Sequence, residues 1–381
     1  MNKILSYFQT KVIAKLKDFY QRRAVIYSDV SRSLMRLSLR EQILFIKQLS
    51  IIIRSGIPLL TALNMVNEQS KSKTMKKIID QVIKDVENGQ YLATTLAKFN
   101  KCFGELTINI IAIGEISGNL SGNLEHIAVS LKKRRALRSK VISAAVYPIF
   151  VILATIAITV MLTVFVFPRV IPVFKSVNYD LPWTTKLLIF ISDTIKNHGF
   201  LIVAGIIFIF IAIFLLLKIK KVHFWFDKIS LSIPFLSSLI QTYNTTSICR
   251  TVGLLLNSGT GVVRSFQITS NTTTNLVYKK DLNIIAEKLT KGERISAHIR
   301  NHKLFPAMVP QMLAVAENTG KLSETFLYLS DSYEEEMDEL TKNLSTTVEP
   351  LLLIFMGILV GFIAVSIITP IYGITQHLTP R

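Results

Sequence analysis

The chain has few of the groups that carry out chemistry. Cysteine occurs only at Cys102 and Cys249, in segments that we place in the cytoplasm, where reduced thiols are expected. Neither the GxxxxGK[ST] phosphate loop nor the GxSxG nucleophile elbow occurs. His298 and His302 have a spacing found in metal sites, but they lack an evident third ligand, so a solvated helix end or loop is the favoured interpretation. The sequence therefore predicts no catalytic residue, cofactor or metal, and no enzyme.

Acidic residues are also scarce. The 381 residues include 25 Asp and Glu against 44 Lys and Arg, which gives a net charge of +19. An excess of this kind is typical of nucleic-acid binding, of attraction to anionic membrane lipid, or of the rule that keeps basic residues on the inner side of a membrane. Aromatic residues are not interleaved with the basic runs, so we expect no nucleic-acid partner.

Three apolar runs contain no charged residue: 149–167, 200–217 and 351–368. A helix needs about 20 apolar residues to cross the ~30 Å hydrocarbon core, so we assign transmembrane helices to 149–168, 199–218 and 350–370. Basic residues precede the first helix and follow the second, which places those flanks inside. We expect a multi-pass protein of the inner (plasma) membrane, with a cytoplasmic N-terminus, an extracytoplasmic loop at 169–198 and an extracytoplasmic tail at 371–381.

The sequence repeats itself. Residues 103–120 return at 305–322, with Glu115 and Gly118 matching Glu317 and Gly320 at an offset of 202. We expect these four residues to form structural turns that cap helices. Each copy is a polar segment followed by an apolar run, so the run at 200–217 is the return crossing that brings the chain back inside.

Helical periodicity prevails in both copies, and no segment alternates with the period of a strand. We expect helices at 39–54, at 73–88 before Gly89, at 103–117 before Gly118, and from about 121 into the first span. The predicted fold is an all-α membrane protein with two repeated cytoplasmic bundles, at 40–148 and 219–349, and three transmembrane helices. A basic segment, 1–39, precedes them.

The apolar runs lack Asp, Glu, Lys, Arg and His, which a proton-coupled transporter usually needs there. They do contain small and hydroxyl residues at helical spacing. We predict that two sets pack transmembrane helices together: Thr155, Thr159 and Thr163, and the GxxxG pair Gly357 and Gly361.

The two copies carry opposite charges at matched positions. At an offset of 202, residues 132–134 are basic in the first copy, whereas residues 334–336 are acidic in the second. These runs are either solvated faces, or they face each other within or between subunits, or they dock different partners. The candidate partner-binding residues are Lys132, Lys133, Arg134, Arg135, Glu334, Glu335, Glu336, Asp338 and Glu339.

Taken together, these motifs resemble a known family. The second copy is the closer match, through residues 305–306, 316–320, 333–336, 349–350 and 357–361. Over about residues 40–373 the chain is similar to the inner-membrane platform proteins of type II secretion systems and type IV pili. It departs from their pattern in its short basic N-terminal segment, at Ile116 and Asn318, where an acidic residue is usual, and at Ala316, which stands where the first copy has Gly114.

The resemblance implies a platform without catalysis. Such a protein binds a hexameric assembly ATPase, passes its motion to pilin or pseudopilin subunits, contacts other inner-membrane assembly proteins, and acts as a homo-oligomer. It leaves open a pilus, a secretion machine or a DNA-uptake structure, and whether a divalent cation is bound. The alternatives from the residues themselves are an oligomeric membrane transporter and a membrane-bound regulatory component.

Overall fold

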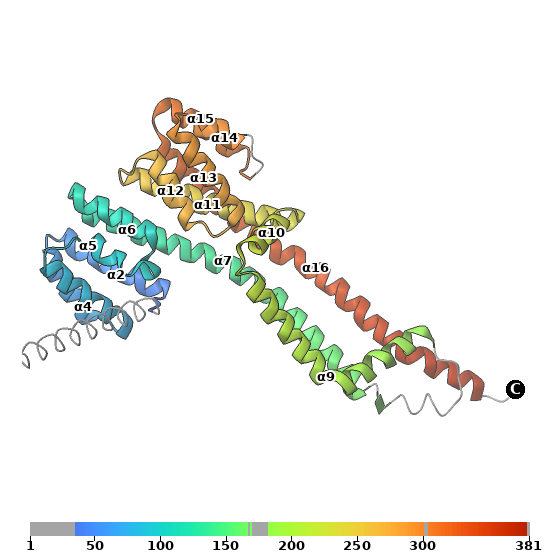
Figure 1. Ribbon diagram of the computed structural model, residues 1–381. Helices are drawn as coiled ribbons and strands as arrows, with labels where there is room; N and C mark the ends of the chain where they lie inside the picture. Colours follow the sequence, from blue (N-terminus) through green and yellow to red (C-terminus); the bar gives the residue numbers. More distant parts are fainter. Residues whose placement is uncertain (1–34, 167, 170–181, 301–303, 379–381) are drawn as a thin grey trace, which may run out of the picture. The chain divides into compact units, whose positions relative to one another are not determined.

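A computed structural model of the chain describes residues 35–166, 168–169, 182–300 and 304–378 (Figure 1). Within these ranges the ordered elements are helices and no strand occurs, which confirms the prediction of an all-α protein. Most of the basic segment, most of the first half of the predicted loop, His302 and the end of the tail lie outside the described residues.

The first bundle contains helices at the predicted ranges 39–54, 73–88 and 103–117, and two shorter helices that were not predicted. Ser38 and Glu41 form a capping box that starts its first helix, because the Ser38 hydroxyl accepts from the Glu41 N–H and the Glu41 carboxylate accepts from the Ser38 N–H. The last helix ends where Gly118 adopts a left-handed conformation, with φ of 72°. The helices of this bundle are α2 (Leu39–Arg54), α3 (Leu59–Gln69), α4 (Lys73–Glu87), α5 (Leu92–Ala97) and α6 (Asn100–Ser117).

The second bundle repeats that order. Its last helix ends at Gly320, whose φ of 71° matches that of Gly118. An additional helix, α10 (Lys220–Ser230), comes before the repeat. The helices that match the first bundle are α11 (Pro234–Asn257), α12 (Val262–Thr272), α13 (Leu276–Thr290), α14 (Ile295–Arg300) and α15 (Met308–Thr319).

Three long helices contain the apolar runs. Helix α7 (Leu120–Met161) continues through Pro148 and passes into a π-helical turn, η1 (Leu162–Val166). Helix α16 (Leu322–Leu378) likewise continues through Pro350. Both of these and α9 (Trp183–Leu216) are long and apolar enough to cross a membrane.

Helix α9 is longer than its apolar run. The sequence predicts a loop over 169–198, whereas residues 183–198 are helical and join the span at a kink at His198. The reason is that this half of the helix buries one face, with Thr185, Leu188 and Ser192 all less than 5% exposed.

The chain divides into two compact units. One comprises the described residues up to Ala136 together with Asn244–Ser332, and the other comprises Leu137–Tyr243 and the described part of Tyr333–Arg381. In the first unit, Leu254, Leu255 and Ile268 of the second bundle belong to the same hydrophobic cluster as the core of the first bundle. The two repeats therefore share apolar packing.

Candidate functional site

A carboxylate from α6 caps the start of α5. Glu115 accepts hydrogen bonds from the main-chain N–H groups of Leu92 and Ala93, at 2.6 and 2.8 Å. Helix α5 has only six residues, and Tyr91 at its N-cap provides no side-chain acceptor. Because the first N–H groups of a helix have no partner within it, a carboxylate supplied from elsewhere is what satisfies them.

The second bundle repeats this arrangement. Glu317 of α15 accepts from the Ile295 N–H and from the Ser296 hydroxyl, both at 2.5 Å, at the start of α14. The sequence predicted Glu115 and Glu317 as turn residues. It did not reveal that each carboxylate binds the start of a helix about 22 residues earlier in the chain.

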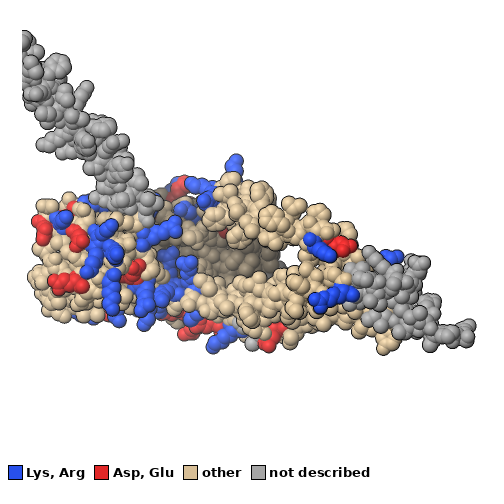
Figure 2. Space-filling view, turned by 90° about the horizontal axis from the view of Figure 1, so that it is seen from below, with Lys and Arg blue, Asp and Glu red and all other residues tan. Residues whose placement is uncertain are grey.

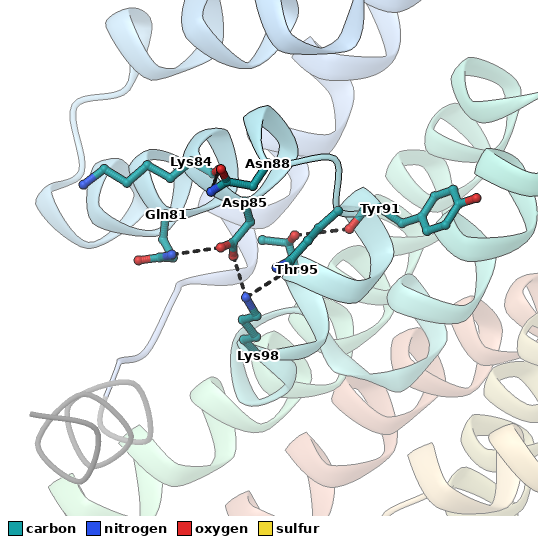
Figure 3. Close-up of polar contacts among 8 residues, drawn as sticks. Gln81, Lys84, Asp85, Asn88, Tyr91, Thr95 and Lys98 are labelled. Atoms are coloured by element: carbon teal, nitrogen blue, oxygen red, sulfur yellow. Dashed lines mark hydrogen bonds and ion pairs between the residues drawn. The ribbon is translucent and has the colours of Figure 1, made fainter. Parts of the chain in front are cut away.

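Each bundle also has a charged contact between its third and fourth helices. In the first bundle the Lys98 ammonium lies 2.8 Å from the Asp85 carboxylate, which also accepts from the Gln81 amide (Figure 3). Asp85 is buried, so the Lys98 ammonium provides the counter-charge that a buried carboxylate requires.

The corresponding contact in the second bundle is made by different positions. His298 Nε2 lies 3.5 Å from Asp281 Oδ1, and both side chains are more than 90% buried. The expectation of a solvated His298 is therefore wrong, because α14 packs that side chain against α13. Among the described residues, no group of three or more His, Cys, Asp or Glu side chains is placed to hold a metal ion.

Charged side chains of α7 and α16 form ion pairs, but the paired residues are not those that the alignment of the two repeats matches. The Lys133 ammonium lies 2.5 Å from the Asp331 carboxylate, and in the other unit the Lys140 ammonium lies 2.5 Å from that of Asp338. Both pairs are 198 residues apart. The repeat offset is 202, so contact between the helices is shifted by four residues, or about one helical turn.

Most of the predicted partner-binding residues do not take part in these two pairs. Lys133 and Asp338 do, with residues outside the predicted set, and the Glu336 carboxylate accepts from the Thr242 hydroxyl at 3.2 Å. Lys133, Glu334 and Asp338 are half-buried. The side chains that face solvent are Lys132, Arg134, Arg135, Glu335, Glu336 and Glu339. Basic side chains are prominent on the face of the molecule shown in Figure 2.

The predicted packing residues of the spans have different surroundings. Thr155 and Thr163 are buried, Thr159 is half-buried, and the Thr155 hydroxyl donates to the Val151 carbonyl of its own helix at 2.8 Å. Gly357 and Gly361 lie in the open, since a Cβ at either would meet nothing within 4 Å.

Hydroxyl groups of α9 join it to both neighbouring spans. The Ser192 hydroxyl donates to the Thr163 carbonyl in the π-helical turn at 2.8 Å, and the Thr185 hydroxyl donates to the Ser366 carbonyl of α16 at 2.7 Å. Hydroxyl side chains that hydrogen-bond across helices in this way contribute to helix packing in membranes. Thr185, Leu188 and Ser192 are spaced three and four residues apart, and this helical spacing is the signal in the sequence for the buried face of α9.

Both thiols lie buried in the bundles, where desolvation disfavours the thiolate form. Burial raises the pKa of Cys249 to about 12, and it raises the pKa of Cys102 above its usual value as well. Neither cysteine has the electropositive, accessible setting of a catalytic nucleophile.

Comparison with known proteins shows the same duplication. The family model described as "Type II secretion system (T2SS), protein F" matches the chain twice, at residues 45–168 and 248–370. Each match comprises a bundle and the apolar helix that follows it, which confirms the predicted repeat.

Several characterised relatives cover most of the chain. A type IV pilus assembly protein PilC of Thermus thermophilus is 29% identical over 342 residues, which cover 90% of this chain and 84% of the relative. The PilC protein of Pseudomonas aeruginosa is 28% identical, covering 86% and 88%. A type II secretion system protein F of Vibrio cholerae is 26% identical, covering 86% and 81%.

Proposed function

The chain belongs to the type II secretion system protein F family, and we propose that it couples a cytoplasmic assembly ATPase to the polymerisation of pilin-like subunits at the inner membrane. The observation that carries this proposal is the match of the family model to both repeats, each of which runs from a bundle into an apolar helix. Relatives named for type IV pilus assembly and for type II secretion match over similar shares of the chain, so both machines remain in the proposal.

The proposed topology follows from charge. Lys132–Arg135 come before the first span, and Lys218, Lys220 and Lys221 follow the second, so both bundles are assigned to the cytoplasm and the C-terminus to the outside. In that orientation both bundles are accessible to a soluble ATPase, and the spans are accessible to the membrane helices of pilin-like subunits.

The exposed charges of the long helices are the proposed docking positions. Lys132, Arg134 and Arg135 of α7 are exposed, and so is Glu339 of α16. Exposed charges contribute little to folding, so they are free to select a partner by its charge. A partner of this kind binds through several ion pairs and loses affinity at high salt.

The test is co-purification of the full chain from native membranes. An N-terminally tagged protein is extracted in mild detergent, and its partners are identified by mass spectrometry. We expect a hexameric assembly ATPase and pilin-like subunits. Recovery of neither, with the protein intact and abundant, would refute the platform role.

A matched pair of variants tests the docking surface itself. Lys132→Glu, Arg134→Glu and Arg135→Glu together are expected to remove one partner from the co-purified set. The control reverses three exposed charges on α4, at Lys76, Lys77 and Lys84. If both triple variants lose the same partner, the effect is one of net charge rather than of this surface.

A further inference from the structure

Helix α10 has its faces arranged opposite to those of a helix on a water-soluble protein. Its large apolar side chains point outwards, with Trp225, Phe226 and Ile229 respectively 65%, 56% and 54% exposed. Two of its polar side chains, Asp227 and Ser230, are both less than 9% exposed, whereas its lysines remain exposed. In water this arrangement has two unfavourable contributions to the free energy. Apolar surface stays hydrated, and a carboxylate is removed from solvent.

The buried polar face is satisfied within the protein. His223 Nε2 lies 3.6 Å from Asp227 Oδ1, and the Ser230 hydroxyl donates to the Asp227 carbonyl at 3.0 Å. Inward polarity is therefore part of the fold, and what needs an explanation is the outward apolar face. Spaced three and four residues apart, Trp225, Phe226 and Ile229 form a single stripe along the helix.

Chain connectivity keeps α10 close to the membrane. The apolar helix α9 ends at Leu216 and α10 begins at Lys220, so only three residues join them. Three extended residues reach at most about 11 Å, so α10 begins within that distance of the apolar helix, close to the headgroup layer that extends about 5–8 Å beyond the hydrocarbon core on each side. The exposed stripe is thus held where a bilayer surface must be.

The charges around the stripe match an anionic surface. Lys218, Lys220, Lys221 and Lys228 flank it, whereas the acidic residue of the helix, Asp227, is buried. The Lys228 ammonium lies 6.0 Å from the centre of the Trp225 ring, at the border between the apolar and charged surfaces. Tryptophan and lysine side by side are typical of helices in the membrane interface, where the ring contacts acyl chains and the ammonium contacts phosphate.

From these observations we propose that α10 lies flat in the headgroup layer, with Trp225, Phe226 and Ile229 inserted among the lipids and the surrounding lysines bound to anionic headgroups. The occupant of the exposed face is therefore anionic phospholipid. This inference is independent of the proposed function, because it concerns the bilayer and not the assembly partners.

The fluorescence of Trp225 tests the insertion directly. The chain has two tryptophans, so Trp183→Phe leaves Trp225 as the single reporter. The full-length variant is reconstituted into phosphatidylcholine vesicles with phosphatidylglycerol, and quenching is measured with aqueous acrylamide and with lipids spin-labelled near the headgroup. We expect acrylamide quenching several-fold below that of N-acetyltryptophanamide, together with strong quenching by the labelled lipid.

Two results overturn the insertion. Efficient quenching by acrylamide would place Trp225 in water. Protection from acrylamide without quenching by labelled lipid would mean that protein, such as a second copy of the chain, covers the stripe.

Lipid selectivity tests the anionic part of the proposal. Spin-labelled phosphatidylglycerol should quench Trp225 more strongly than labelled phosphatidylcholine at equal content, and Lys220→Gln, Lys221→Gln and Lys228→Gln together should make the two equal. The reciprocal variant Trp225→Phe leaves Trp183, at the far end of α9, as a control that the lysine changes should not affect. Equal quenching by both lipids in the chain with its lysines intact would overturn the anionic assignment.

Discussion

Removal of the Glu115 carboxylate should loosen the first bundle by a predictable amount. Glu115→Ala leaves the N–H groups of Leu92 and Ala93 at the start of α5 without their acceptor. Helix α5 cannot replace it from its own N-cap, because Tyr91 has no side-chain acceptor there. We therefore expect α5 and its contact with α6 to open more often.

The magnitude follows from the number and type of bonds lost. A hydrogen bond to a charged group contributes ~1.5–3 kcal/mol, and Glu115 makes two of them. The two bonds sum to about 3–6 kcal/mol, but water can reach the N–H groups once the carboxylate is gone, which reduces the expected loss to about 2–3 kcal/mol. At ~1.4 kcal/mol for each tenfold change, the opening equilibrium should rise about 30- to 150-fold.

Native cysteines provide the assay. Cys102 is 3% exposed in the first bundle and Cys249 is 1% exposed in the second, so each reacts with a thiol reagent only when its surroundings open. Labelling of the full chain in detergent is followed for each cysteine by mass spectrometry of its peptide. Glu115→Ala should accelerate labelling of Cys102 more than that of Cys249, and Glu317→Ala should do the reverse.

The control is a second carboxylate of the same bundle. Glu125 forms an ion pair with Arg54, but both side chains are about half exposed, at 50% and 54%. Such a pair contributes ~0–1 kcal/mol, so Glu125→Ala should change the labelling of Cys102 less than about fivefold. If Glu115→Ala has no larger effect than Glu125→Ala, the cap does not stabilise the bundle and the reasoning is refuted.

Other predictions follow from burial and close packing. Burial raises the pKa of Cys249 from 9.0 in the unfolded chain to about 12 in the folded chain. The contribution of the neutral thiol to stability should therefore be complete below pH 9 and fall between pH 9 and pH 12. A free energy of unfolding that stays constant over that window in urea titrations would contradict this. Gly253→Ala places a Cβ 2.9 Å from Leu327 and should destabilise the bundles by about 1–3 kcal/mol in the same titrations, whereas Gly357→Ala meets nothing within 4 Å and should be neutral. Thr185→Val removes a hydroxyl that bonds to α16 and should cost about 1 kcal/mol, measured as a lower thermal midpoint in detergent, with no shift expected for an exposed threonine of the bundles.

Local signals in the sequence were sufficient to predict α2, α4 and most of α6 in the first bundle, but not the shorter helices α3 and α5. The predicted range 39–54 agrees with α2, because an apolar face, a capping box and a following turn all act within one stretch of chain. Gly118 ends α6 as predicted for the same reason, since the left-handed conformation is a local property of glycine.

Features that depend on packing were not predictable in this way. The helix at 183–198 owes its place to Thr185 and Ser192, whose acceptors are 181 and 29 residues away. Paired residues of α7 and α16 are 198 positions apart, whereas matched residues of the two repeats are 202 apart. Which residues pair depends on how the two helices pack, and the alignment of the repeats does not contain that information. The burial of His298 depends likewise on packing, because the side chain is covered by α13, which the local sequence around His298 does not indicate.

The kink at His198 gives α9 two halves with different mechanical roles. The half before the kink is fastened to the neighbouring spans by two hydroxyl bonds, whereas no residue from 199 to 216 is buried. The apolar length of this helix therefore faces outwards almost throughout, and the hydrogen bonds that tie α9 to the neighbouring spans lie in the half before the kink. The other end of α9 leads into α10 through three residues, so the proposed seating of α10 in the headgroup layer restrains this crossing at its second end.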